Sequence, residues 1–298
     1  MVDKLNTPYY GVYGEEMEES SGSQSIERAT NLLALVAQSH ATGSTLNDLV
    51  RSSGLKQATA RRLLLALIRA GLVSQDEGTR RYHLGLTAYL YGTIATDSFA
   101  DHMMADEAVR RLAERSEDTA FFSVRQGLHT LCMRREEGLH PIRSHVLNIG
   151  QRHPLGVAAH GIAILASLPD AEVEMISATH RAYYDSHYPM LTEDVLRQAI
   201  AEARRRGCAI NRGIFHRGAW AISVAVHGPS GQVIGALSIG AIEDRLNEQR
   251  QPEIIAMLKS EARKLESRFS EVALHLNPTT NDGAVTRRRI NGSERTPS

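Results

Sequence analysis

The sequence contains few cysteines and no long apolar run. Only two of its 298 residues are cysteines, Cys132 and Cys208, so neither a disulfide framework nor a four-cysteine zinc site can form. No stretch approaches the roughly 18 to 20 consecutive apolar residues that a membrane-spanning helix needs. The N-terminus also lacks the basic and then apolar layout of a signal peptide. We therefore expect a cytoplasmic protein.

Net charge is also absent, but the charges are segregated along the chain. The 34 Lys and Arg residues balance 34 Asp and Glu residues. Residues 1–23 carry one basic and five acidic residues, which is typical of a disordered acidic tail. Residues 24–85 carry eight basic and four acidic residues, a net charge of +4. A small basic module at one end of a chain favours contact with nucleic acid.

No motif specific for catalysis is present. The chain has no GxSxG motif, no P-loop and no glycine-rich dinucleotide motif after a predicted strand. His180 and His187 are seven residues apart, which is not the i, i+4 spacing of zinc proteases. We therefore expect no catalytic residue, no metal ion and no cofactor. The alternative is a small-molecule enzyme that pairs Cys132 or Cys208 with a distant histidine.

Residues 24–85 predict a winged helix-turn-helix domain. Apolar residues recur at helical spacing over 25–38, and Thr45 is placed to cap a short helix that ends at Gly54. Residues 55–71 form a third amphipathic segment. A hairpin follows, with strands at 72–74 and 80–84. Two helices joined by a short turn and followed by a basic hairpin are typical of this DNA-binding fold.

The polar side of the third helix is the candidate DNA-reading face. Residues near the start of a recognition helix reach base edges in the major groove, whereas wing arginines contact phosphates or the minor groove. The candidates are Lys56, Gln57, Thr59, Arg61 and Arg62 on the helix, and Arg80 and Arg81 on the wing. A protein-interaction module with a vestigial winged helix is the second alternative.

Residues 86–101 predict a linker helix and residues 102–276 predict an α+β domain. Its strands are expected at 119–126, 129–137, 140–150, 208–213, 219–229 and 232–241, and its helices at 102–118, 154–169 (introduced by Pro154), 170–181, 192–206 and 250–276. This order indicates a mostly antiparallel sheet with helices around it. Residues 277–298 carry four arginines and two acids and are interpreted as a disordered basic tail.

The α+β domain favours a small-molecule pocket. Such pockets have apolar walls and a few convergent polar groups. The small residues at 158–161 would expose backbone groups, and the strands carry Trp220 and Ser238. Asn211 and Arg212 lie at a strand end, where a cation could pair with a carboxylate.

Five segments together resemble the IclR family of bacterial transcriptional regulators. They are SIERATNLLALVAQ, SGLKQATARRLLLALIRAGLV, RRYHLG, RHPLGVAAHGIAILA and RGCAINRGIFHRGAWAISVAVHGPSGQVIGALSIGA, and they fall within residues 24–276. The resemblance implies an N-terminal winged helix-turn-helix that binds operator DNA. It also implies a C-terminal GAF-like domain that binds a small effector, often an organic acid or an aromatic compound. The assembly implied is a homodimer or homotetramer.

The same motifs imply which residues contact the effector. They are Ala159, His160, Asn211, Ala219, Ala221, Ser238 and Gly240, and Trp220 is added from the pocket argument above. The sequence departs from the family pattern at Gly161-Ile162-Ala163, where many relatives have Gly-Lys-Ala, and Ala221 and Gly240 replace more polar residues. Fewer polar anchors predict an effector more apolar than a two-carbon acid, or altered or absent ligand binding.

Overall fold

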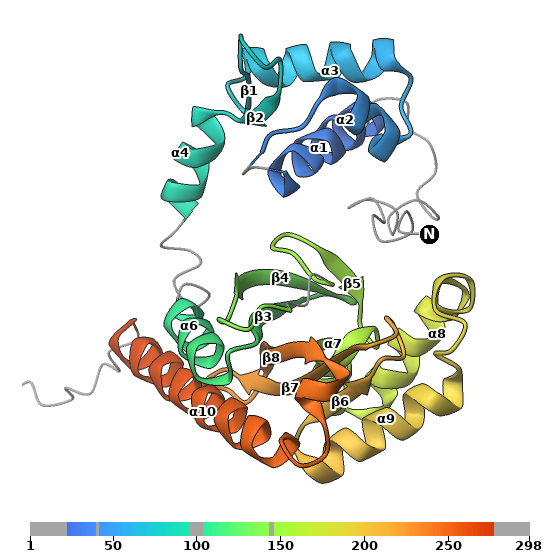
Figure 1. Ribbon diagram of the computed structural model, residues 1–298, viewed down its shortest axis with the longest axis vertical. Helices are drawn as coiled ribbons and strands as arrows, with labels where there is room; N and C mark the ends of the chain where they lie inside the picture. Colours follow the sequence, from blue (N-terminus) through green and yellow to red (C-terminus); the bar gives the residue numbers. More distant parts are fainter. Residues whose placement is uncertain (1–22, 40–41, 96–103, 143–145, 277–298) are drawn as a thin grey trace, which may run out of the picture.

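The computed structural model describes residues 23–39, 42–95, 104–142 and 146–276. They form two units, which are connected through helix α4 (Leu86–Ala95) (Figure 1). The tails expected at 1–23 and 277–298 lie outside the described residues, apart from Ser23, and so do residues 96–101 of the predicted linker. Within the described ranges, no helix is long and apolar enough to cross a membrane.

The N-terminal unit has the predicted winged helix-turn-helix order. Helices α1 (Ser23–Gln38), α2 (Leu46–Ser53) and α3 (Gln57–Arg69) precede strands β1 (Val73–Gln75) and β2 (Tyr82–Leu84), which pair antiparallel. Thr45 and Asp48 form a capping box at the start of α2, and each side chain accepts a hydrogen bond of 3.2 Å from the other residue's backbone N–H. Gly54 ends α2 with a left-handed φ of 68°. The predicted short helix and its two caps are confirmed.

The core of this unit determines which side of α3 faces outward. Ala60, Leu63, Leu64 and Leu67 recur at helical spacing and are buried against Leu32, Leu35, Val36 and Leu49. Because these apolar residues occupy one stripe of the helix, the remaining side of α3 is left to solvent. The polar side predicted to read DNA therefore lies on the surface.

The C-terminal unit is built on one antiparallel sheet. Its helices are α6 (Ala105–Ser116), α7 (Ala158–Ala166), α8 (Asp170–His187), α9 (Glu193–Arg206) and α10 (Gln251–Leu276), with a 3-10 turn η2 at Glu243–Leu246. Its strands are β3 (Thr119–Gln126), β4 (His129–Glu136), β5 (Arg152–Pro154), β6 (Ala209–Arg212), β7 (Ala219–His227) and β8 (Val233–Ile242). They are ordered β5-β4-β3-β8-β7-β6. The α+β class with a mainly antiparallel sheet is confirmed.

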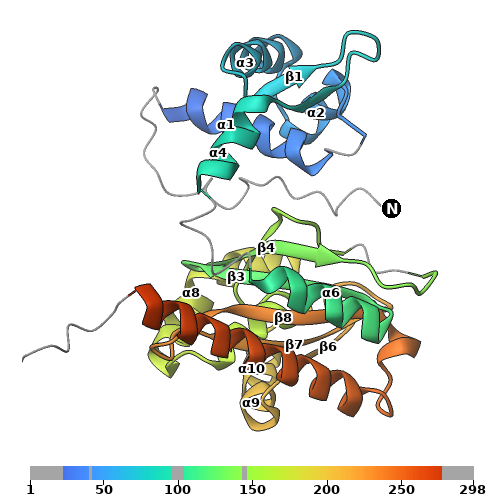
Figure 2. The same cartoon turned by 90° about the vertical axis from the view of Figure 1, so that its left-hand side faces the viewer.

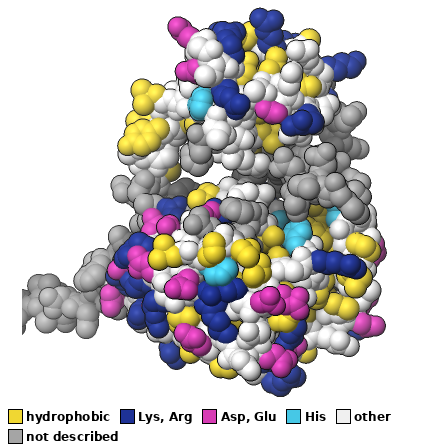
Figure 3. Space-filling view, in the orientation of Figure 1, with side chains coloured by type: hydrophobic (Ala, Val, Ile, Leu, Met, Phe, Trp, Pro, Cys, Tyr) yellow, Lys and Arg dark blue, Asp and Glu magenta, His cyan; other side chains and the backbone are white. Residues whose placement is uncertain are grey.

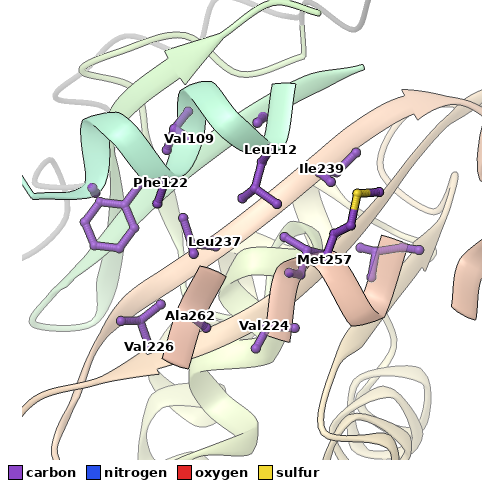
Figure 4. Close-up of a cluster of buried hydrophobic side chains, with 14 of the residues drawn as sticks. Val109, Leu112, Phe122, Val224, Val226, Leu237, Ile239, Met257 and Ala262 are labelled. Atoms are coloured by element: carbon purple, nitrogen blue, oxygen red, sulfur yellow. The ribbon is translucent and has the colours of Figure 1, made fainter. Parts of the chain in front are cut away.

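Helices cover both faces of this sheet. α6 and α10 lie on one face, and α7 lies on the other with α9 beside it (Figures 1 and 2). Under α6 and α10 the strands present large apolar side chains, including Phe122, Val224, Leu237 and Ile239, which pack against Met257 and other residues of these helices (Figure 4). Successive residues of a strand point to opposite faces, so the neighbours of these residues face α7. That second face contains the candidate effector site.

Two details of the predicted larger domain are wrong. The described parts of 140–150 contain no strand, because Gly150 turns the chain at φ 82° and the Asn148 N–H donates to Gln151 Oε1 instead of to a neighbouring strand. Pro154 does not introduce the helix but ends β5, an edge strand, where a residue without an N–H is tolerated. The helix begins four residues later, at Ala158.

Candidate functional site

The predicted DNA-reading face of α3 is open to solvent. Lys56, Gln57, Arg61 and Arg62 are exposed, and Thr59 is half-buried. Figure 3 shows Lys and Arg side chains gathered over α3 at the end of the N-terminal unit furthest from the sheet domain. Among the described residues, no carboxylate lies within ion-pair distance of Arg61 or Arg62. Both guanidinium groups are therefore available to a phosphate.

The two wing arginines differ in their surroundings. Arg80 is exposed in the turn between β1 and β2 and has a left-handed φ of 58°. Arg81 is half-buried, and its Nη1 donates to the carbonyl oxygens of Gly43 at 2.8 Å and Thr42 at 3.3 Å. Arg81 therefore holds the wing against the segment that precedes α2. This tie depends on two backbone carbonyls, which no residue pattern reveals.

Most of the predicted effector residues line one cavity of about 40 Å³ between α7 and the sheet. Seven of the eight are in its wall, namely His160, Asn211, Ala219, Trp220, Ala221, Ser238 and Gly240. The register explains how they meet, because Ala221 pairs with Gly240 across β7 and β8, and with Asn211 across β6 and β7. The polar and small residues of three strands therefore converge beneath the first turn of α7.

The structure does not bring Ala159 or Arg212 to this cavity. Ala159 is fully buried among the apolar residues of α7 to α9, and the wall residue is its neighbour Ala158, since successive helix positions point about 100° apart. Arg212 lies next to Asn211 on the opposite side of β6, with Nη1 4.0 Å from Glu202 Oε1. The predicted cation for an effector carboxylate is therefore absent from the cavity wall.

Several wall residues were missed by sequence reasoning. The aromatic ones are Phe121, Tyr188 and Phe215, and the two further histidines are His153 and His216. Tyr188 and Phe215 meet edge to face with ring centroids 5.4 Å apart. These residues come from four separate segments, so no local spacing could have grouped them. The available signals were in segments already singled out, since His153 stands in RHPLG and both Phe215 and His216 stand in RGCAINRGIFHRGAW.

The polar wall residues are partly committed to internal bonds. The hydroxyls of Ser223 and Ser238 bond to each other across β7 and β8. Asn211 Oδ1 accepts a hydrogen bond of 3.1 Å from the Ile214 N–H, which fixes the β6–β7 connection over the cavity. That connection carries Gly213 and Gly218, with φ values of 76° and 79°. Glycine adopts these angles without strain, so the path of the connection favours glycine at both positions.

Two imidazoles lie against each other at the cavity wall. The His153 and His160 rings are stacked with centroids 5.7 Å apart and an interplanar angle of 20°. His160 is 3% exposed, and neither its Nε2 nor His153 Nδ1 has a hydrogen-bond partner. Burial disfavours the charged form of both, and lowers the pKa of His153 to about 4 and that of His160 to about 3. Both rings are neutral at physiological pH.

The cysteine alternative gains no support. Burial raises the pKa of the Cys132 thiol to about 12 and also raises that of Cys208. Since the thiolate is the nucleophile, neither sulfur is activated. Over the described part of the chain, no three His, Cys, Asp or Glu side chains are grouped to hold a metal ion.

Comparison with known families identifies the protein's class. The model of the bacterial transcriptional regulator IclR C-terminal domain matches residues 101–267, and the model of the IclR helix-turn-helix domain matches residues 25–77. The chain belongs to the IclR family. It is therefore a helix-turn-helix transcriptional regulator with a C-terminal effector-binding domain. The alternatives of an enzyme and a protein-interaction module are not favoured.

Curated relatives of this IclR-family chain are also regulators. It is 24% identical over 225 residues to the HTH-type transcriptional regulator XynR of Escherichia coli, covering 76% of this chain and 88% of XynR. It is 29% identical over 242 residues to the glycerol operon regulatory protein of Streptomyces coelicolor, covering 80% of this chain and 94% of that protein.

Solved structures of the family share the fold. A putative IclR transcriptional regulator from Silicibacter sp. TM1040 has a TM-score of 0.63 at 26% identity, over 83% of this chain and 96% of its own. An IclR homologue from Microbacterium hydrocarbonoxydans, solved in complex with 4-hydroxybenzoate, has a TM-score of 0.64 at 19% identity, over 83% and 99% of the two chains.

The buried His160 predicts a specific loss of stability in acid. Its folded pKa of about 3 lies below the ordinary value of 6.5, so the unfolded chain binds more protons at pH 5 and stability falls as the pH drops below that ordinary value. Between pH 7 and 5 this group should cost about 2 kcal/mol. We expect His160→Gln to lose less unfolding free energy over this interval than the unchanged protein. Urea unfolding followed by the fluorescence of Trp220, the single tryptophan, measures this difference in the effector domain.

The control is His187→Gln, a matched change at an exposed position on α8. An equal pH dependence in His160→Gln and the unchanged protein would show that His160 is protonated alike in the folded and unfolded chains.

Proposed function

We propose that this regulator reads operator DNA through the exposed start of α3 and responds to a small organic acid or aromatic effector in the cavity beneath α7. The observation that carries the proposal is the combination of the two sites in one chain. One is a cationic helix face whose Arg61 and Arg62 have no carboxylate partner among the described residues, and the other is an aromatic-walled cavity in a separate unit. We further propose that it acts in the cytoplasm, where operator DNA is found.

The geometry of α3 supports major-groove docking. Lys56 and Gln57 are at the helix start, and Arg61 and Arg62 follow one turn later on the exposed side. Arginine binds guanine edges and phosphates with two parallel hydrogen bonds, whereas a glutamine amide suits adenine. Arg80, at the exposed tip of the wing, is placed for a phosphate or minor-groove contact. Arg81 would act by holding the wing in position.

The cavity wall supports an apolar effector with one polar group. Phe121, Phe215, Tyr188 and Trp220 provide flat apolar surface. No Asp, Glu, Lys or Arg is among the described wall residues, so polar recognition falls to the histidines, Asn211 and Ser238. The small volume suits a compact ligand, unless the β6–β7 connection moves to admit a larger one.

Helix α4 supports assembly with a second copy of the chain. It buries none of its residues, and five large apolar side chains are 50% to 79% exposed, namely Leu86, Tyr89, Leu90, Tyr91 and Ile94. Figure 3 shows this apolar surface beside the N-terminal unit. A contiguous exposed apolar patch marks an interaction site. A dimer through α4 would bring two α3 helices to one operator, with half-sites spaced by the dimer axis.

An effector that binds the DNA-competent and incompetent forms unequally shifts their populations. A coupling free energy of about 1 to 3 kcal/mol is typical of such regulators. In the proposed dimer, α4 is both the contact between the two copies and the helix that follows the DNA-reading unit in the chain. A change in the sheet domain could therefore alter the spacing of the two α3 helices through α4.

The α3 face predicts salt-dependent DNA binding that individual arginines control. Arg61→Ala and Arg62→Ala should each weaken binding to the upstream region of the protein's own gene. Each should also reduce the slope of log affinity against log salt by about one, as expected for one lost phosphate contact. Fluorescence anisotropy at several salt concentrations measures both quantities. The control is Arg69→Ala, an exposed change in the last turn of α3. Unchanged affinity in both test variants would favour an interaction module without DNA binding.

The α4 face predicts that charge on this helix breaks the dimer. The double variant Tyr89→Glu with Leu90→Glu should dissociate the N-terminal units, because two carboxylates would be desolvated in an apolar interface. We expect at least a tenfold weaker affinity for a two-half-site operator with little change for a single half-site. Leu139→Glu, at an exposed leucine of the sheet domain, is the control. Equal loss on both DNAs would mean that α4 acts within one chain.

A side chain that fills the cavity should abolish the response to effector and leave operator binding unchanged. Ala221→Leu adds three carbons at the wall and should prevent a panel of acids, from acetate to 4-hydroxybenzoate, from raising the melting temperature. Operator binding without ligand should persist. Ala225→Leu is the matched control, since it lies on the same face of β7 but outside this cavity. A full response in Ala221→Leu would place the effector elsewhere.

A further inference from the structure

The described part of the cavity wall places no Asp, Glu, Lys or Arg beside its histidines. His153 comes from β5 and His160 from α7, and their rings are stacked. From the β6–β7 connection His216 faces them, and from the segment after α8 Tyr188 completes the titratable groups of the wall. Asn211, Trp220 and Ser238 of the sheet strands are uncharged. Nothing in the described wall can therefore stabilise an imidazolium or a carboxylate while the cavity is empty.

Two imidazole nitrogens are nonetheless unpartnered at this wall. They are His160 Nε2 and His153 Nδ1, and a buried polar atom without a partner destabilises the folded protein. His160 is almost completely buried, so bulk water does not provide the missing bond. A ligand that bonds to these nitrogens recovers that free energy. The pair therefore points to the polar end of the ligand.

We propose that the cavity binds a weak carboxylic acid together with one proton, which is held between the ligand carboxylate and the His153–His160 pair. The proposal rests on the proposed effector function of this cavity and adds the chemical form in which the ligand is bound. The proton comes from solvent and forms one N–H bond on an imidazole, or stays on the ligand oxygen and is donated to that nitrogen. No other bond forms or breaks, and the proton returns to solvent when the ligand leaves.

Charge balance favours an acid taken up with a proton over an acid bound as a bare anion. Removing a carboxylate from water into a dry site costs several kcal/mol unless an opposite charge is close. Among the described wall residues there is no Arg or Lys, so of these residues only a protonated histidine can supply that charge. In the empty cavity the same histidines stay neutral because burial lowers their pKa values to about 4 and about 3. Ligand and proton therefore stabilise each other, and each binds poorly alone.

Charge balance also distinguishes this ligand from a neutral one. An alcohol or amide could also form hydrogen bonds to these nitrogens, but it would bring no negative charge to stabilise a protonated ring and would bind with little dependence on pH. A carboxylate has two oxygens, so it can face both rings of the stacked pair at once. The two stacked rings, each with an unpartnered nitrogen, therefore favour the acid.

Isothermal titration calorimetry at pH 6 and pH 8 tests the proposal. The probes are acetate, benzoate and 4-hydroxybenzoate, each compared with its amide, in buffers of different protonation enthalpy. For an acid that binds, we expect uptake of about one proton and an affinity about a hundredfold lower at pH 8 than at pH 6, which is tenfold per pH unit for one linked proton. The matching amide should bind more weakly and equally at both pH values.

Two variants assign the effect to the stacked pair. His160→Gln and His153→Gln each keep a hydrogen-bonding side chain of similar reach but cannot take up a proton, so each should reduce the pH dependence and the proton uptake. His187→Gln, on the surface of α8, is the control and should retain both. Retained Trp220 fluorescence and helical circular dichroism show that a variant is folded.

The outcomes separate this proposal from the effector function itself. Acid binding without proton uptake would overturn the proton-linked form and leave the effector site in place. So would a pH dependence of binding in both His160→Gln and His153→Gln that equals that of the unchanged protein. An amide that binds as tightly as its acid at pH 6 would overturn it in the same way. Failure of every acid and every amide to bind at either pH, in a folded protein that still binds operator DNA, would overturn the effector site.

Discussion

The close approach of α7 to the sheet is the constraint on which the effector domain depends. The strand residues beneath α7 are small, among them Ser123, Ser223, Ala236 and Ser238. α7 also carries small residues, among them Ala159 and Ala163, and a side chain on Gly161 would come within 2.9 Å of the backbone nitrogen of Gly156 in the turn before the helix. Small residues on both sides let the helix and the sheet approach closely. The candidate effector cavity lies below the first turn of α7.

The two faces of the sheet thus differ in the residues that they bury. Large aliphatic and aromatic side chains under α6 and α10 form one core of the domain, and burial of such apolar surface dominates folding. On the α7 face, small residues and uncharged polar residues surround the cavity. Histidines fit this environment because they remain neutral when buried, whereas a lysine or arginine in the same wall would need a permanent counter-ion. The lack of fixed charge among the described wall residues is therefore consistent with how this face is packed.

Sequence reasoning identified the elements whose signals are local. The capping residue Thr45, the left-handed Gly54 and the alternating strands of the sheet were all predicted correctly because each depends on neighbours a few residues away. Ala159 was misplaced relative to the cavity by one helix position, since a motif does not specify the rotation of a helix against a sheet. His153, Tyr188 and Phe215 were missed because they meet only after distant segments fold together.

β3 is the element that can transmit occupancy of the cavity to the rest of the chain. Phe121 is in the cavity wall, and the next residue, Phe122, is fully buried in the core beneath α6. α6 packs on β3 and is the first described helix after α4, so it stands between the sheet and the DNA-reading unit in the chain. Because close-packed interiors transmit strain instead of absorbing it, a ligand that displaces Phe121 must also shift Phe122 or the helix above it. Phe121 and Phe122 thus connect the cavity wall to the packing of α6.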